Sequence, residues 1–241
     1  MLLEIATHSL TSAKRASASG ADRLELCAEL GVGGLTPSPG LVEATLAGVT
    51  IPVYALIRPR SGDFHYTAEE LVTMERDIRW CLDRGCSGVV IGVLQRDRAI
   101  DQDATRRLIA AAAGKPVTFH RAFDWTPDPL RALDTLLELG VGTLLTSGQQ
   151  PKAEAGLDRL AAWQQRVGED LTIMPGSGVG PENAPLFAKA GFRAIHASAA
   201  RVDYEWSHPF PFSFNTPAML NEQVRYETQG DRVRGIVRMI K

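Results

Sequence analysis

The sequence predicts an α/β protein folded as a single-domain TIM-type (β/α)8 barrel over residues 1–241. Eight short apolar runs alternate along the chain with amphipathic stretches, and many runs begin just after Gly, Pro or Asp. The 241 residues therefore give about 30 residues per strand and helix, which is typical of such barrels. A hydrophobic content of 44% and a charged content of 22% are those of a globular protein with one large core.

The predicted elements follow one another in the order that parallel βα units require. The eight expected strands cover residues 2–6, 23–27, 52–58, 88–94, 116–121, 143–147, 171–176 and 193–197. The amphipathic stretches with the clearest helical pattern cover residues 68–84, 103–113, 129–139, 153–167 and 181–190. We expect an irregular crossover over residues 203–221, because Pro209, Pro211 and Pro217 stand there among aromatic residues. A closing helix is expected over residues 231–240.

Charge and hydropathy exclude several classes of protein. The 28 acidic and 26 basic residues give a net charge of −2, so the sequence predicts no nucleic-acid binding. No apolar stretch approaches the roughly 18 residues of a membrane span, and the first residues lack a basic signal region. Three cysteines are too few for a disulfide framework. We therefore expect a cytoplasmic protein that does not bind membranes.

The strand pattern predicts which polar side chains point to the barrel axis. Successive side chains of a strand face opposite sides, so polar residues between large apolar ones are expected to point inward. The residues in this phase are Glu4, Glu25, Cys27, Arg58, His120, His196 and Ser198. Because active sites of this fold lie at the strand carboxyl ends, Glu4, Glu25, Arg58, His120 and His196 are candidate catalytic residues. In the alternative interpretation, Arg58 pairs with Glu4 and Glu25 in an ion network that only stabilises the core.

The loops at the same end add candidate ligand-binding residues. Donor-rich loops follow the third and fifth strands and contribute Arg60, Asp63, Arg121 and Asp124 to the predicted pocket. Small and hydroxyl residues follow the last three strands, where this fold often binds phosphate through backbone amides. The predicted anion-binding residues are Arg60, Ser147, Gly148, Gly176, Ser177, Gly178 and Ser198. A solvated, charged surface would explain the donor-rich loops equally well, and a tight turn would by itself require the glycines.

These residue types suit two kinds of chemistry. A Glu or His beside Arg58 could transfer protons, so an isomerase, lyase or hydrolase acting on a small anionic or phosphorylated metabolite is one candidate. Schiff-base chemistry fits poorly, because the lysines lie at a strand start, on helices or at the terminus. Alternatively, a divalent ion such as Mn, Mg or Zn could be bound by Glu4, Glu25, His120 and His196. Cys27 and Met174 could instead offer sulfur to copper(I).

Several motifs resemble the CutC copper homeostasis family. They are GADRLELC at residues 20–27, GGLTPS at 33–38, IRPR at 57–60, GDF at 62–64, TFHRAFD at 118–124 and LTSG at 145–148. The resemblance runs from the first to the eighth expected strand. It implies a cytosolic α/β barrel, a homo-oligomer such as a dimer or tetramer, and copper handling with Cys27 as a copper(I) ligand. The enzyme described above is the alternative.

Overall fold

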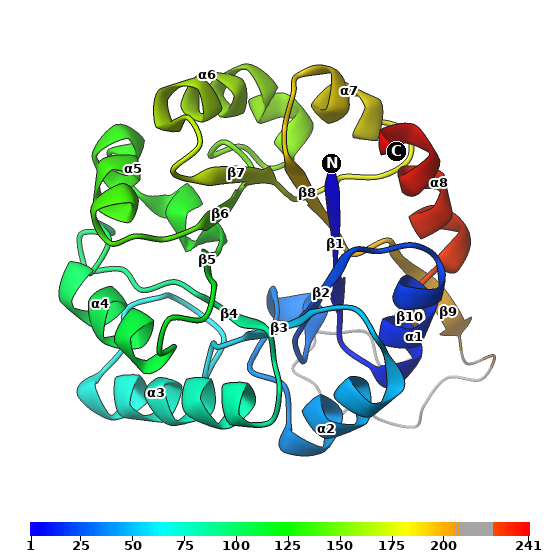
Figure 1. The fold of residues 1–241 in the computed structure, drawn as a ribbon, viewed down its shortest axis with the longest axis horizontal. Coiled ribbons are helices and arrows are strands. Elements are labelled where there is room, and N and C mark those ends of the chain that lie inside the picture. The colour runs from blue at the N-terminus through cyan, green and yellow to red at the C-terminus, as the bar shows by residue number, and fades with distance from the viewer. Residues whose placement is uncertain (206, 208–223) are drawn as a thin grey trace.

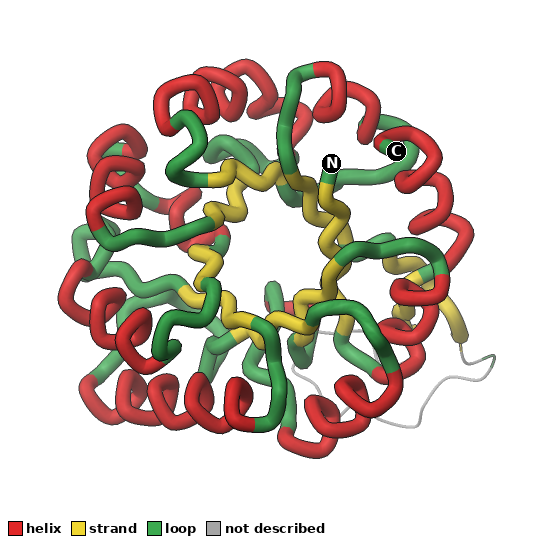
Figure 2. The backbone as a smooth tube through the Cα atoms, in the orientation of Figure 1, coloured by secondary structure: helices red, strands yellow, loops and turns green. Residues whose placement is uncertain are grey.

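The computed structural model describes residues 1–205, 207 and 224–241, and it confirms the predicted barrel (Figure 1). Eight parallel strands form one sheet in the order β7-β6-β5-β4-β3-β2-β1-β8. Their bounds are β1 Leu2–Thr7, β2 Arg23–Leu26, β3 Val53–Leu56, β4 Gly88–Ile91, β5 Val117–Phe119, β6 Thr143–Thr146, β7 Thr172–Pro175 and β8 Ala194–Ala197. Figure 2 shows the strands as a ring surrounded by helices. Strands β7 and β8 are the two ends of the hydrogen-bonded order and lie side by side where the ring closes.

Helices follow the strands around the outside of the ring. They are α1 Leu10–Ala18, α2 Pro39–Gly48, α3 Ala68–Asp83, α4 Gln102–Ala111, α5 Pro129–Glu138, α6 Leu157–Val167, α7 Ala184–Lys189 and α8 Gly230–Ile240. Side-chain caps start several of them: Thr67 forms a capping box with Glu70, and Asp101 and Asp128 accept backbone N–H bonds. The predicted closing helix over residues 231–240 corresponds to α8.

Two expected helices begin later than predicted. The stretch 153–167 starts as the 3-10 helix Ala153–Gly156 before α6 begins, and the stretch 181–190 becomes helical only at Ala184. Asn183 Oδ1 accepts the Gly180 N–H and its Nδ2 donates to the Gly178 carbonyl, so the segment before α7 is held as a turn.

The expectation of an irregular crossover from residue 203 is wrong at its start. Residues 203–205 belong to β9 Ala200–Glu205, which pairs antiparallel with β10 Val224–Thr228. An ion pair of 2.6 Å between Arg15 and Asp203 ties β9 to α1. On β10, the buried Glu227 accepts hydrogen bonds from two serines at the start of α1, Ser9 and Ser12. The remainder of the expected crossover, residue 206 and residues 208–221, lies outside the described residues.

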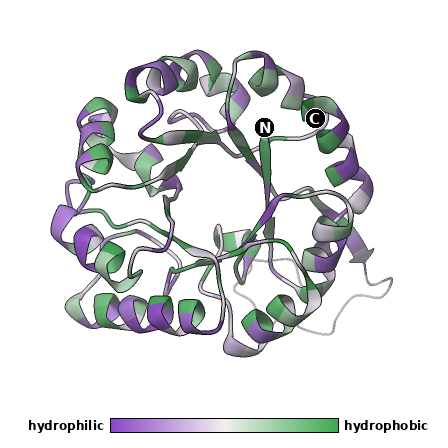
Figure 3. Cartoon of the chain, viewed as in Figure 1, coloured by the Kyte–Doolittle hydropathy of each residue, from purple (hydrophilic) through white to green (hydrophobic). Residues whose placement is uncertain are grey.

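The strand side chains alternate between two environments, as the sequence predicts. Outward residues such as Leu3, Ile5 and Leu24 join the large core between the strands and the helices. Inside the ring, separate small clusters form around Tyr54 and Met174. Figure 3 shows helices that combine hydrophilic and hydrophobic surface around largely hydrophobic strands. Polar side chains that point inward are therefore enclosed by the barrel.

In the described part of the chain, no helix is both long and apolar enough to cross a membrane.

Candidate functional site

A cavity of about 900 Å³ lies at the carboxyl ends of the strands. Its walls come from strands β1, β2, β3, β6, β8 and β9, from the loops that follow β2, β3, β5, β7 and β8, and from α8. Eight predicted site residues line it: Glu25, Arg58, His120, Arg121, Ser177, Gly178, His196 and Ser198. The barrel thus brings together residues that are up to 173 positions apart in the sequence, from Glu25 to Ser198.

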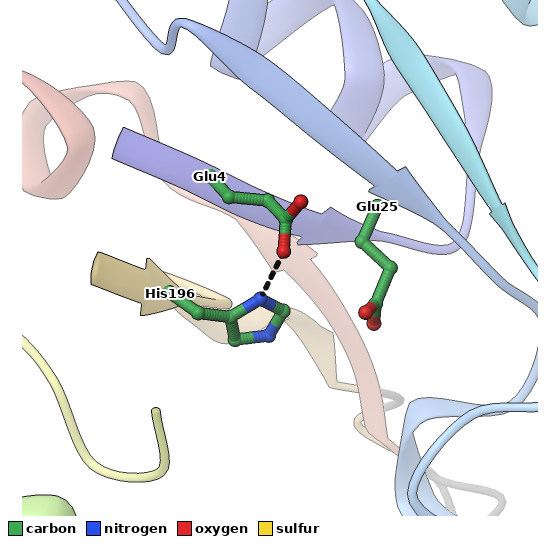
Figure 4. Close-up of side chains that lie close together, drawn as sticks. All are labelled: Glu4, Glu25 and His196. Carbon is green, nitrogen blue, oxygen red and sulfur yellow. Dashed lines mark hydrogen bonds and ion pairs between the residues drawn. The ribbon is translucent and has the colours of Figure 1, made fainter. Parts of the chain in front are cut away.

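Glu4, Arg23 and His196 form a buried hydrogen-bonded cluster on the β8–β1–β2 side of the barrel. His196 Nδ1 lies 2.8 Å from Glu4 Oε1 (Figure 4), and Arg23 Nε donates to Glu4 Oε2 at 2.6 Å. Burial would raise the pKa of Glu4, but the hydrogen bond from His196 and the charge of Arg23 lower it below its usual value. Glu4 is therefore ionised, both of its carboxylate oxygens have hydrogen-bond partners, and it orients the His196 ring.

Glu25 faces this cluster without a hydrogen-bond partner for one oxygen. Its Oε2 is buried and makes no hydrogen bond within the described residues, and Glu4, Glu25 and His196 have ligand atoms within 4.8 Å of one another (Figure 4). Burial raises the pKa of Glu25 to about 7; the charges of His196 and Arg23 oppose this rise, and that of Glu4 adds to it. Glu25 therefore exchanges its proton near neutral pH, which suits an acid or a base.

His196 is the second group of this site that can carry a proton. Burial would lower its pKa, but the charge of Glu25 and the hydrogen bond to Glu4 outweigh burial and raise it. Its Nδ1 is held by Glu4, so Nε2 is the nitrogen free to act on a ligand or on Glu25. Glu25 and His196 together can hold or release a proton at one place in the cavity.

His120 lies on a different side of the cavity and has the opposite electrostatic character. Its Nδ1 accepts the Ala122 backbone N–H at 3.1 Å. Burial lowers its pKa to about 3, and the positive charge of Arg58 adds to this effect. The ring packs against Gly92 and lies 4.9 Å from the Phe64 ring between centroids. His120 is therefore neutral at physiological pH and is a poor base.

Gly92→Ala tests how tightly His120 is held. A Cβ at residue 92 would lie 2.3 Å from His120 Cε1, so the ring has to move. We expect a loss of about 1–3 kcal/mol in the free energy of unfolding, measured by chemical denaturation. Gly142→Ala is the matched control, because its Cβ would meet nothing within 4 Å. Equal stability of the two variants would contradict this description of the site.

Arg58 does not form the ion network of the alternative interpretation, in which it would pair with Glu4 and Glu25. Its Nη1 donates to the carbonyls of Val32 and Gly34, and its Nη2 donates to the carbonyl of Gly62. Arg23 takes the predicted role of Arg58 beside Glu4, because residues 4 and 23 are directly paired between β1 and β2. Arg58 instead joins two loops of the cavity wall and brings positive charge near His120.

Arg121, Asp124 and Ser147 form a second polar cluster beside the cavity. Arg121 donates to Asp124 Oδ2 and to Ser147 Oγ, both at 2.9 Å. Asp124 also accepts hydrogen bonds from the Ser147 and Gln149 backbone N–H groups. Its carboxylate therefore holds an arginine and shapes the loop after β6, and Arg121 alone of the three lines the cavity.

The structure divides the predicted anion-binding residues that follow the last three barrel strands into two groups. Ser177, Gly178 and Ser198 line the cavity next to Arg232 of α8. Ser147, Gly148 and Gly176 lie behind the cavity wall. A Cβ on Gly176 would lie 2.4 Å from Leu145, and one on Gly148 would meet the backbone of Gly156 at 3.0 Å.

The loops after β7 and β8 contain two residues with an unusual backbone conformation. Ser177 and Ala199 adopt positive φ angles of 87° and 49°, which is unusual for residues other than glycine.

Arg60 and Asp63 lie outside the cavity wall. Arg60 Nε donates to Glu70 Oε1 at 2.5 Å, and Arg60 Nη2 lies 3.1 Å from Asp63 Oδ1. Arg60 therefore holds the loop after β3 against α3, and Asp63 binds Arg60 and the His65 backbone N–H within that loop.

Cys27 is a poor fit to a copper(I) site. Its thiol is buried, and burial raises its pKa well above the usual value, so the thiolate that copper needs is disfavoured. Cys81 and Cys86 are the other two cysteines of the chain; one lies in α3 and the other just before β4, at the opposite end of the barrel. Met174 Sδ accepts a hydrogen bond from Arg23. The described residues therefore do not present copper(I) with a set of soft ligands.

A divalent ion fits the acidic cluster only in part. Of the four residues predicted for this role, Glu4, Glu25 and His196 come together and His120 does not. Both oxygens of Glu4 are already occupied, which leaves Glu25 and His196 Nε2 as ligand atoms.

Sequence reasoning missed Arg23, which is the ion partner of Glu4. The signal was present, because Arg23 precedes Glu25 by two residues and so points to the same face of β2. Tyr54 was missed as well; its ring lies 4.2 Å from the Arg23 guanidinium carbon and supports it inside the barrel.

Taken together, the fold and the site define a (β/α)8 barrel with ionisable groups gathered at the carboxyl ends of its strands. The CutC family model matches residues 1–201, and the chain belongs to this family. A CutC family protein of Klebsiella pneumoniae is 41% identical over 242 residues, covering 99% of this chain and 97% of its own. A CutC family protein of Xanthomonas campestris is 46% identical over 200 residues and covers 83% of each chain.

A solved structure from the same family supports the fold. CutC of Streptococcus agalactiae, described as a proposed copper homeostasis protein, is 32% identical and superimposes with a TM-score of 0.78. The match covers 82% of this chain and 98% of the other.

Proposed function

We propose that this protein is an enzyme that transfers a proton on a small anionic metabolite bound in the barrel cavity. The observation that carries the proposal is the buried Glu25 carboxyl, whose pKa of about 7 and unpartnered Oε2 suit proton transfer near neutral pH. A carboxyl placed this way destabilises a core, so an acid–base role accounts for it better than a structural role does.

The neighbouring residues supply the other parts of such a site. His196 has a ring nitrogen within 4.8 Å of a carboxylate oxygen of Glu25 and can share its proton, while Glu4 holds the ring. Ser177, Gly178, Ser198 and Arg232 would bind the anionic group of the metabolite across the cavity rim. Proton transfer of this kind serves isomerases, lyases and hydrolases.

The proposal is tested by a thermal-shift screen with small phosphorylated and carboxylated metabolites. Metabolites that stabilise the protein are then incubated with it in D2O, and deuterium incorporation is followed by NMR. We expect exchange with the wild type and a loss of about 10²–10⁴-fold with Glu25→Gln. Failure of every metabolite to stabilise the wild type, or equal exchange by the variant, would contradict the proposal.

A cytoplasmic role in copper homeostasis is a second candidate. The description of the Streptococcus agalactiae relative favours it. In that function Cys27 is the sulfur ligand that the cavity side of the barrel offers, and binding requires its buried thiol to lose a proton.

Copper(I) titration of the reduced protein and of Cys27→Ser tests this second candidate. Stoichiometric, tight binding that the substitution abolishes would support it. From the burial of Cys27 we expect equal and weak binding by both proteins, because the neutral thiol has no second cysteine beside it at this end of the barrel. Cys81→Ser is the control, because that thiol belongs to the opposite end.

A further inference from the structure

The His120 ring is fixed in one hydrogen-bonded state. Its Nδ1 accepts the Ala122 N–H at 3.1 Å, and a neutral imidazole that accepts through one nitrogen carries its proton on the other. The proton is therefore on Nε2. The glycine at position 92, directly after β4, gives the ring room to lie against the backbone there, and Phe64 packs against the ring.

The Nε2–H group has no hydrogen-bond partner among the residues that the structure describes. It is buried, it makes no hydrogen bond to any described residue, and His120 belongs to the cavity wall. Buried N–H groups without partners are rare in native proteins. An oxygen atom of a bound ligand would satisfy this donor.

The positive charge around His120 indicates which kind of ligand oxygen would accept this hydrogen bond. Arg58 and Arg121 both place positive charge near His120, as their effect on its pKa shows. Such surroundings favour an oxygen that gains negative charge during a reaction, which is the property of a carbonyl oxygen.

We propose that His120 is a neutral hydrogen-bond donor to a carbonyl oxygen of the substrate, so that the cavity binds small anionic carbonyl compounds. This inference rests on the proposed function. Glu25 lies on β2 and His196 on β8, whereas His120 directly follows β5, which lies on another part of the ring (Figure 1). A substrate between them presents its carbonyl oxygen to His120 and the neighbouring carbon to Glu25.

The chemical step balances with these groups alone. The Glu25 carboxylate takes the proton from the carbon beside the carbonyl, and the electrons of that C–H bond form a C=C bond. The carbonyl π electrons move to oxygen, and the negative charge there is stabilised by the His120 N–H. Return of the proton from Glu25 to the same carbon re-forms the C=O bond and completes a hydrogen exchange. When that carbon also carries a hydroxyl group, movement of the hydroxyl proton to the former carbonyl oxygen, with return of the Glu25 proton to the former carbonyl carbon, completes an isomerisation.

The state of His120 is tested directly on the wild type by NMR of ¹⁵N-labelled imidazole rings. We expect a neutral ring with the proton on Nε2 from about pH 5 to pH 8. A charged ring in this range, or a proton on Nδ1, would overturn the proposal. This measurement needs neither a substrate nor a variant.

Ligand binding is tested with phosphoglycolohydroxamate, whose hydroxamate resembles an enediolate and whose phosphate suits the Ser177 and Gly178 rim. We expect the wild type to bind it with a shift of the His120 Nε2–H resonance. His120→Gln keeps a donor and is expected to bind within about threefold of the wild type, whereas His120→Phe is expected to lose about tenfold or more. His65→Phe, at a histidine outside the cavity wall, is the control for a change of ring type.

The outcomes separate this inference from the proposed function. Equal affinity of wild type and His120→Phe, or no binding by the wild type, would overturn the carbonyl assignment. Deuterium exchange on another metabolite that depends on Glu25 would still support proton transfer in that case. Thermal melting establishes whether each variant is folded, and His120→Gln carries the comparison if His120→Phe is not.

Discussion

Replacing Arg23 with methionine is expected to destabilise the protein by about 3–5 kcal/mol, because the fully buried Glu4 carboxylate loses its arginine partner. His196 alone then compensates the charge of Glu4. The free energy of unfolding from chemical denaturation at neutral pH measures the effect. Methionine keeps much of the side-chain volume, so the loss reports on charge more than on packing.

Two further variants define the cause. The double variant Arg23→Met with Glu4→Gln is expected to regain part of the lost stability, since it removes the unpaired charge as well. Arg106→Met removes one partner of an exposed ion pair with Asp103 and is expected to change stability much less. A loss below about 1 kcal/mol for Arg23→Met would show that water reaches Glu4 and that the cluster is not enclosed.

The second large effect is expected for Glu25→Gln, which should stabilise the protein at neutral and higher pH. The pKa of Glu25 is about 7 in the folded protein, against an ordinary value of 4.5. Between these values the unfolded chain releases the proton while the folded protein keeps it, so the stability contributed by Glu25 falls as pH rises. The total loss in the free energy of unfolding is on the order of 3 kcal/mol. The Glu25→Gln variant avoids this loss because glutamine does not ionise.

Denaturation at about pH 4.5, 6 and 8 measures this difference. We expect the two proteins to be nearly equal at the lowest pH and the variant to gain steadily above it. Glu138→Gln is the control, because Glu138 is exposed on α5. A constant difference between variant and wild type across this range would mean that Glu25 titrates normally. Loss of proton transfer together with a gain in stability would identify Glu25 as a group retained for chemistry.

The barrel could be predicted well from the sequence because the alternation of apolar runs and amphipathic stretches is local and repeats along the chain. All eight strands lie within or next to their predicted ranges, and the inward phase of Glu25, His120 and His196 followed from their apolar neighbours. The partner of Glu4 could not be chosen in the same way. Arg23 and Arg58 both point inward, and only the register between β1 and β2 places Arg23 beside Glu4.

Other features depend on contacts that a single strand pattern does not contain. Arg60 was expected at an anion site, but Glu70 of α3 binds it instead. The β9–β10 pair joins segments separated by many residues, so periodicity alone gave no sign of it. The pKa of His120 is set by burial and by Arg58, which comes from a different part of the chain.

The closure of the ring between β7 and β8 has a mechanical consequence. These two strands end the hydrogen-bonded order, so the barrel has a seam there, and Ser177 and Ser198 stand just beyond its two edges. An anion that contacts both loops would act as a clasp across this seam. Binding of this anion would then slow the exchange of backbone amide protons along the whole length of β7 and β8.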